Sequence, residues 1–207
     1  MRKHILRPFK YLLLALVLLP LELHAGENPD LNMAPAVADK RGVHLDEIAV
    51  GTGYAWGYLK YSRATFDAVP GFVRFGFDMN SFFGMRDRKG TLQLAFEPFV
   101  NPVTRPETGA EAGLNVLIRY LHPVSPSAKL VTEIGTGPMY LSIDTAEQGK
   151  SGFNFLNQFG LGAQVAVTGK SALTMGYRFR HLSNAGSSIP NRGINTNALM
   201  ISYSLLY

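Results

Sequence analysis

Apolar residues recur at every second position in eight separate runs of this sequence, with no helical period between the runs. In a β-strand successive side chains point to opposite faces, so each run predicts a strand with one apolar and one polar face. In the seventh run, for example, Leu173, Met175 and Tyr177 are apolar, and small or polar residues stand between them. The runs cover residues 48–57, 73–79, 92–97, 114–120, 129–142, 158–165, 173–183 and 198–207. The sequence therefore predicts an all-β fold.

Two architectures can use this alternation. A soluble sandwich or lipocalin-type barrel turns its apolar faces inward, whereas an outer-membrane barrel turns them outward and fills its lumen with polar groups. The polar faces here combine glycine with isolated charges such as Arg119 and Glu133, while lysine is scarce in the runs, which suits a narrow lumen. Aromatic residues near the ends of the runs fit interfacial girdles; they are Trp56, Phe72, Tyr120, Tyr140, Tyr203 and Tyr207. We expect residues 46–207 to form an eight-stranded antiparallel transmembrane β-barrel.

The first 25 residues have the features of a secretory signal. Four basic residues lead into an apolar run at 11–21, and a small residue ends the segment at Ala25. That run is about half the roughly 20 residues that a membrane-spanning helix needs. Removing the signal lowers the formal charge from +5 to about +2, so the basic composition gives no reason to expect nucleic-acid binding. Residues 26–45 lack a sustained period and are expected to be an N-terminal lead-in segment, and the absence of cysteine excludes disulfides.

An even number of strands leaves both chain ends on the periplasmic side, so the seventh strand runs outward. A strand tilted by about 40° climbs roughly 2.5 Å per residue, which puts His181 about 20 Å beyond Leu173 in an apolar band about 25 Å tall. The alternation places His181 and Ser183 on the apolar, lipid-facing side. If the hairpin closes symmetrically around 184–192, His181 lies opposite Asn195 on that same side.

The arginines of the seventh strand have the other parity. We expect Arg178 and Arg180 to point into the lumen and to pair there with Glu97 or Glu133. Arg192 lies in the outer loop instead, and is therefore the better candidate for contact with a lipid phosphate.

One hairpin resembles a known family. The string His-x-Ser-Asn-Ala-Gly that begins at His181, followed by Pro-Asn-x-Gly beginning at Pro190, is similar to the active-site hairpin of the lipid A 3-O-deacylases. These enzymes, also called PagL, are eight-stranded outer-membrane esterases, and the similarity in layout extends over nearly the whole mature chain. The resemblance implies that Ser183 is the nucleophile and His181 the general base of a serine esterase.

The resemblance also implies the other members of the site. Asn184, Gly186 and Asn191 would shape the oxyanion site, through side chains and backbone amides. The family's acid is a glutamate twelve residues after the serine, and here that position is Asn195. A carboxylate stabilises a charged imidazole better than an amide does, although asparagine still orients the ring in Cys-His-Asn sites.

We therefore expect an outer-membrane enzyme with its site on strands seven and eight, which removes an ester-linked (3-O) acyl chain from lipid A of lipopolysaccharide without a cofactor. Two alternatives stay open: a phospholipase-like acyl hydrolase that uses the same site, and a non-enzymatic structural or adhesive barrel. The sequence does not decide which acyl ester is cut, whether Asn195 supports activity, whether a metal assists or whether a homodimer forms.

Overall fold

The computed structural model describes residues 42–85 and 89–207, and its regular structure is entirely β-strand. The predicted signal at 1–25 and most of the lead-in segment lie outside the described residues. β1 begins at His44, slightly before the predicted start of the barrel. The strands are β1 (His44–Tyr58), β2 (Thr65–Ala68), β3 (Gly71–Asp78), β4 (Thr91–Arg105), β5 (Gly109–Ser125), β6 (Ala128–Leu141), β7 (Gly152–Thr168), β8 (Ser171–Ser183) and β9 (Ile194–Leu206). Among the described residues, no helix is long and apolar enough to cross a membrane.

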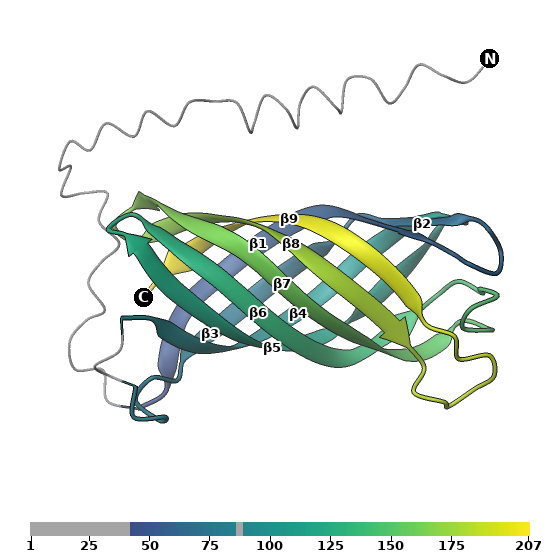
Figure 1. Cartoon of the computed structure of the whole chain (residues 1–207), viewed down its shortest axis with the longest axis horizontal. Helices are drawn as coiled ribbons and strands as arrows, with labels where there is room; N and C mark the ends of the chain where they lie inside the picture. The colour runs from purple at the N-terminus through teal and green to yellow at the C-terminus, as the bar shows by residue number, and fades with distance from the viewer. Residues whose placement is uncertain (1–41, 86–88) are drawn as a thin grey trace, which may run out of the picture.

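These strands close into a barrel, because neighbours pair antiparallel along the chain and β1 also pairs with β9 (Figure 1). β2 and β3 both pair with β1 and with β4, so together they fill one position in the wall. Pro70 lies between them and has no N–H to continue the hydrogen-bond ladder. The predicted ring of about eight antiparallel strands is confirmed, with β2 as a short segment that the alternation did not show.

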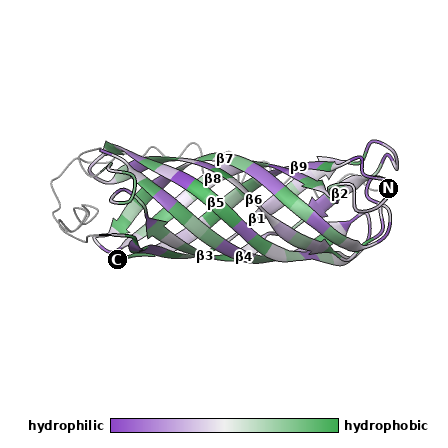
Figure 2. Cartoon of the chain, turned by 90° about the horizontal axis from the view of Figure 1, so that it is seen from below, coloured by the Kyte–Doolittle hydropathy of each residue, from purple (hydrophilic) through white to green (hydrophobic). Residues whose placement is uncertain are grey.

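The outer wall is apolar. Ile118, Ile134 and Phe159 are each more than half exposed, and they belong to three neighbouring strands. Hydrophobic residues recur along the strands in the view of Figure 2. Contiguous apolar surface of this extent is rare on water-soluble monomers, and it matches the band that an outer-membrane barrel presents to hydrocarbon.

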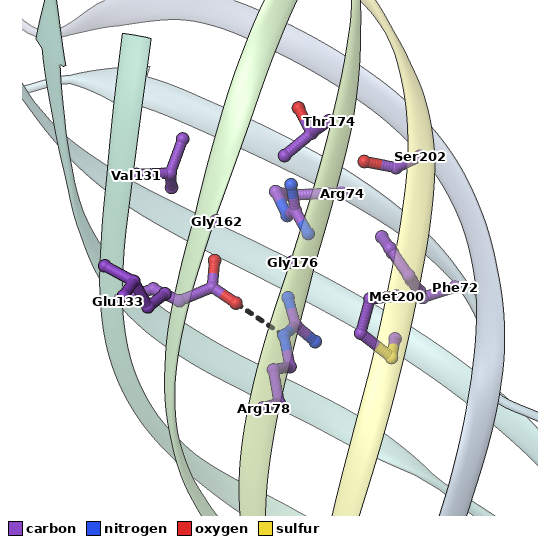
Figure 3. A pocket seen from close by; sticks show the side chains of 11 residues that line it. Phe72, Arg74, Val131, Glu133, Gly162, Thr174, Gly176, Arg178, Met200 and Ser202 are labelled. Atoms are coloured by element: carbon purple, nitrogen blue, oxygen red, sulfur yellow. Dashed lines mark hydrogen bonds and ion pairs between the residues drawn. The ribbon is translucent and has the colours of Figure 1, made fainter. Parts of the chain in front are cut away.

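Charged side chains fill the middle of the lumen. Arg178 binds Glu133 at 2.5 Å and Glu97 at 2.6 Å, and Arg74 binds Glu97 at 2.8 Å. Figure 3 shows Arg74, Glu133 and Arg178 pointing into this space from three different strands. Arg119 adds ion pairs to Glu133 and to Glu47 of β1. The lumen is thus packed with paired charges, as a barrel of this size allows, and the inward position of Arg178 agrees with the prediction.

Arg180 has a different partner from the one predicted. It binds Glu111 at 2.5 Å, and Glu111 also accepts a hydrogen bond from Asn101 at 2.7 Å. The reason is the position of each residue along the barrel axis. Arg180 is the next lumen-facing residue of β8 after Arg178, and Glu111 lies near the start of β5, at the same end of the barrel.

The outer end of the lumen is apolar, which the sequence analysis did not anticipate. Phe72 was expected in an interfacial girdle, yet it is 6 % exposed and lies inside, 5.0 Å from the Arg74 guanidinium carbon and 5.4 Å from that of Arg178. It belongs to a buried cluster that closes this end. The other members are Ala55, Leu59, Phe66, Ala68, Phe99, Val103, Met139, Leu141, Ile143, Leu156, Leu182, Ile194 and Ala198.

Candidate active site

β8 carries His181 and Ser183 on the outer wall of the barrel. Both side chains are half-buried. Arg180, which precedes His181, and Leu182, which stands between His181 and Ser183, are buried on the inner side. Leu182 has no exposed surface and belongs to the apolar cluster. Because successive side chains alternate, this inward anchor fixes the outward direction of its two neighbours. The predicted parity of the strand is therefore present in the structure.

Asn195 lies directly opposite His181 in the β8–β9 ladder. The distance between His181 Nδ1 and Asn195 Oδ1 is 2.6 Å. The side-chain oxygen accepts, so the contact favours the imidazole tautomer with its proton on Nδ1 and leaves Nε2 as an acceptor. Ile194, which is 1 % exposed, anchors this strand from the inside as Leu182 anchors the other. The register expected from symmetric closure of the hairpin is the observed one.

Gly193 packs against the imidazole from the loop side. Its φ is +71°, in the left-handed region that favours glycine. A Cβ at this position would lie 2.5 Å from Cε1 and 3.2 Å from Nε2 of His181. Only glycine therefore lets the loop approach the ring so closely. The glycine of the Pro-Asn-x-Gly string was the signal for this contact, although no role was assigned to it from the sequence.

The Ser183 hydroxyl makes no hydrogen bond within the described part of the chain. Its Cα lies two residues beyond that of His181 on the same face, about 6.6 Å away for a rise of 3.3 Å per residue. A histidine and a serine side chain can span that separation. Catalytic hydrogen bonds are often unformed without substrate, so the missing bond between Ser183 and His181 does not argue against the pair.

Asn184 organises the loop that follows β8. It is 2 % exposed, and its Nδ2 donates to Ser188 Oγ at 2.9 Å and to the Pro190 carbonyl at 3.1 Å. Its Oδ1 accepts from the Gly186 amide at 2.9 Å. The Asn184 side chain and the Gly186 amide, both expected at the oxyanion site, are thus engaged inside the loop in this structure. Their roles toward an oxyanion stay predictions.

Two other donors near Ser183 lack a partner among the described residues. Asn191 Oδ1 accepts from the Asn184 amide at 3.1 Å, which orients the side chain and leaves its Nδ2 free. The amide of Ala185, whose φ is +52°, makes no hydrogen bond in that same part of the chain. Ala185 was not singled out from the sequence, because a loop amide carries no signal in residue type.

The β6–β7 loop holds the β1–β2 and β8–β9 loops together. Glu147 accepts from the Tyr61 amide at 3.0 Å through its carboxylate and from the Arg192 amide at 2.9 Å through its carbonyl. The Arg192 guanidinium carbon lies 3.9 Å from the centre of the Tyr61 ring. Contact between Arg192 and a lipid phosphate is untested and stays a prediction.

An apolar groove of about 570 Å³ runs along the outer wall and reaches His181. Its walls are mostly aliphatic and aromatic side chains of β4 to β8, such as Ile118, Ile134 and Phe159. Asn157 stands at the end near the site, opposite His181 on the β7 side. Parity counted back from Phe159 would have placed Asn157 there, so the sequence held a signal that was not used.

The site offers imidazole, hydroxyl and amide groups, and no carboxylate is hydrogen-bonded to its histidine in the described residues. Within residues 42–85 and 89–207, no group of three or more His, Cys, Asp or Glu side chains could hold a metal ion. The chemistry that these groups can perform is acyl transfer through a serine, with the imidazole as proton carrier.

The closed barrel, its apolar outer wall and its charged lumen define an outer-membrane β-barrel protein. The sequence profile described as "Lipid A 3-O-deacylase (PagL)" matches residues 51–204. The chain belongs to this family of lipid A deacylases, which confirms the resemblance and the expected location in the outer membrane.

Two solved structures share the fold. The outer membrane enzyme PagL is 17 % identical with a TM-score of 0.52, over 75 % of this chain and 97 % of that one. Neisserial surface protein A is 12 % identical with a TM-score of 0.55, over 81 % of this chain and 100 % of that one. No curated protein matches the chain. Since an enzyme and a surface protein fit about equally well, the fold alone does not determine the activity.

Proposed function

We propose that this protein is a serine esterase of the outer leaflet that removes the 3-O-linked acyl chain of lipid A. Membership in the deacylase family supports the substrate class. The observation that carries the proposal is the 2.6 Å contact between His181 Nδ1 and Asn195 Oδ1 on the lipid-facing wall, with Ser183 next on the same face. A site that faces hydrocarbon accepts an acyl ester without removing it from the bilayer.

In the first step His181 Nε2 takes the proton of the Ser183 hydroxyl, and Oγ attacks the ester carbonyl carbon. The carbonyl oxygen gains the negative charge. When the intermediate collapses, the bond to the sugar oxygen breaks, and the imidazolium returns its proton to that leaving alkoxide. Water, deprotonated by the same imidazole, then attacks the acyl-serine and releases the fatty acid, which restores the free hydroxyl.

The developing oxyanion needs donors that are in place beforehand. The amide of Ala185 and Nδ2 of Asn191 are two donors near Ser183 without a partner in the described residues. Asn184 supports them indirectly, because its backbone amide orients the Asn191 side chain and its own side chain fixes the turn. We assign the oxyanion role to Ala185 and Asn191, with Asn184 and Gly186 shaping the loop around them.

The apolar groove supplies the binding site for the acyl chain. It ends at His181, so a chain that lies in it brings its ester to the imidazole and to Ser183. Asn157 at this end hydrogen-bonds Thr136 at 2.8 Å, which leaves its side-chain amide nitrogen as a donor. An apolar channel with a few polar groups at one end suits a fatty acyl ester.

Mass spectrometry of lipid A from cells that produce each variant tests the proposal. The wild type should release one hydroxyacyl chain, and Ser183→Ala should release none. Asn195→Glu should release as much or more, because a carboxylate stabilises the imidazolium better than an amide. Heat-dependent migration in gel electrophoresis verifies that each variant forms a barrel.

The other outcomes separate the alternatives. Unchanged lipid A in all three strains would reject the deacylase and favour a structural barrel. Serine-dependent loss of acyl chains from phospholipids, with intact lipid A, would mean a phospholipase that uses the same site. Release of a chain other than the 3-O-linked one would correct the position of the ester and keep the mechanism.

A further inference from the structure

A second cavity, this one polar, lies at the outer end of the barrel between the β6–β7 and β8–β9 loops. It has a volume of about 460 Å³, within the usual range of roughly 300–1,000 Å³ for small-molecule sites. Asn184 and Phe153 both line it. Asn184 directly follows Ser183, and Phe153 is on the strand that pairs with Ser183. The cavity therefore adjoins the candidate site on the side opposite to the apolar groove.

Two buried side chains in its wall have an unpaired polar atom. Gln148 and Asn154 are each 2 % exposed, and within the described residues Gln148 Nε2 and Asn154 Oδ1 have no hydrogen-bond partner. Their other ends are engaged: Gln148 Oε1 accepts from the Asn184 amide at 3.0 Å, and Asn154 Nδ2 donates to the Gly152 carbonyl at 3.1 Å. One donor and one acceptor are thus held in fixed orientation. Buried groups without partners are costly, and polar groups of a ligand can offset that cost.

The cavity also carries a positive charge. Lys150 lines it, is exposed and forms no ion pair within the described part of the chain. The nearby carboxylate of Asp144 accepts from the Ser151 amide at 2.7 Å and so belongs to the turn. The hydroxyls of Ser187 and Ser188 complete the polar lining. Hydroxyl recognition beside an unneutralised ammonium fits a phosphorylated sugar.

We propose that this cavity binds the phosphorylated glucosamine end of the lipid A substrate, with its phosphate at Lys150 and sugar hydroxyls at Gln148 and Asn154. The inference rests on the proposed function, since it takes the substrate to be lipid A. It places the two ends of one amphiphile on either side of Ser183: the sugar in the polar cavity and the acyl chain in the apolar groove. The cavity then determines which lipid is held long enough to react.

The experiment measures equilibrium binding to the Ser183→Ala protein in detergent, so no turnover is needed. The probes are lipid A, lipid A with its phosphates removed, and phosphatidylglycerol. Lys150→Ala should weaken lipid A binding about tenfold, as expected for a lost charge-assisted contact, and should leave the dephosphorylated form unaffected. Lys60→Ala, an exposed lysine of another outer loop, is the matched control and should change neither.

Gln148→Glu keeps the oxygen that accepts from Asn184 and replaces the free amide donor with a carboxylate oxygen, so it should weaken binding of both forms of lipid A. If Gln148→Glu fails to form a barrel, the binding measurements on Lys150→Ala, which changes an exposed residue, still test the proposal. Equal affinities for Lys150→Ala and Lys60→Ala would overturn the proposal. The proposal would also be overturned if Lys150→Ala weakened binding of phosphatidylglycerol tenfold as well, because the site would then recognise a phosphate without the sugar. The wild-type hydrolysis assay tests the proposed function separately.

Discussion

Two neighbours hold the His181 imidazole from opposite sides. Asn195 Oδ1 accepts a hydrogen bond from His181 Nδ1 at 2.6 Å, and Gly193 lies against the ring edge that carries Cε1 and Nε2. The first contact selects the tautomer, and the second fixes the ring plane by packing. An asparagine provides orientation without the charge of a carboxylate. The close glycine therefore has more importance here than in a site where an ionised acid holds the ring.

Replacing this glycine tests the idea. Gly193→Ala should lower deacylation at least tenfold in kcat while the barrel still forms, because the new Cβ would lie 2.5 Å from His181 Cε1 and displace the ring. The left-handed φ of +71° adds about 1–2 kcal/mol of backbone strain. Rates on purified lipid A in detergent measure the effect.

Gly84→Ala is the matched control. Gly84 has a φ of +64°, and a Cβ added to it would meet no heavy atom within 4 Å. It lies in the β3–β4 connection, at the other end of the barrel from the site. The alanine there carries similar backbone strain without touching the imidazole. Equal activities for the two variants would show that the close contact between Gly193 and the imidazole is not needed for catalysis.

At the scale of the strand, β8 and β9 present the site because their inner residues are anchored. Leu182 and Ile194 are almost fully buried in the apolar cluster that closes the outer end of the lumen. Each stands beside an outward residue of the site. The strands cannot rotate about their axes without moving these side chains out of the cluster, so the interior packing determines the direction of His181 and Asn195.

Truncating the anchor should therefore affect stability and activity together. Leu182→Ala is expected to cost roughly 2–5 kcal/mol of unfolding free energy, as for other fully buried leucines. Leu199→Ala is the control, since Leu199 is 41 % exposed on the lipid side of β9 and leaves no internal cavity. Reversible urea unfolding in lipid vesicles measures the free energy of unfolding of both variants, and the rate on purified lipid A in detergent measures their activity. A cost for Leu199→Ala as large as that for Leu182→Ala would contradict the role of the inner cluster.

The same alternation explains how much the sequence could predict. It placed His181 and Ser183 outside and Arg178 inside, because an apolar face that repeats along a strand determines the direction of every side chain on that strand. It also placed Phe72 on the face of Arg74, although Phe72 was assigned to the girdle by residue type alone. The Arg180–Glu111 pair was missed because parity gives the face of a side chain and not its height across the lumen.

The loops were beyond this reasoning. The contacts of Asn184, Gln148 and Glu147 join segments far apart in the chain, and no period relates them. The break at Pro70 that separates β2 from β3 was visible in principle, but β2 is only four residues long and shows no clear alternation. Local pattern thus predicted the wall of the barrel, whereas the outer cavity required coordinates.

At the scale of the whole molecule, the barrel is held by a balanced lumen network. Arg178 and Arg74 share Glu97, and Arg178 also binds Glu133. The network contains three arginines and three glutamates, of which all but the partly buried Glu133 are almost fully buried; they are Arg74, Arg119, Arg178, Glu47, Glu97 and Glu133. Removing one charge from such a set leaves a partner buried and uncompensated.

Glu97→Gln should therefore destabilise the barrel by roughly 3–5 kcal/mol, although the side chain keeps its size. Arg178 retains Glu133, but Arg74 keeps only Glu47, at 4.0 Å. Urea unfolding in vesicles gives the free energy. Adding Arg74→Met should recover part of the loss, because it restores the balance of charge, and the double-mutant cycle measures that coupling.

An ion pair whose arginine is exposed provides the control for this prediction. Arg105→Ala removes an ion pair of 3.4 Å to Asp67, and because the arginine is 66 % exposed while the aspartate is 8 % exposed, it should cost less than Glu97→Gln. The difference between the two costs then measures what burial adds to the loss of a charge. If Glu97→Gln costs no more than Arg105→Ala, the apolar cluster and the backbone ladder hold the barrel, and the buried charges merely fill it.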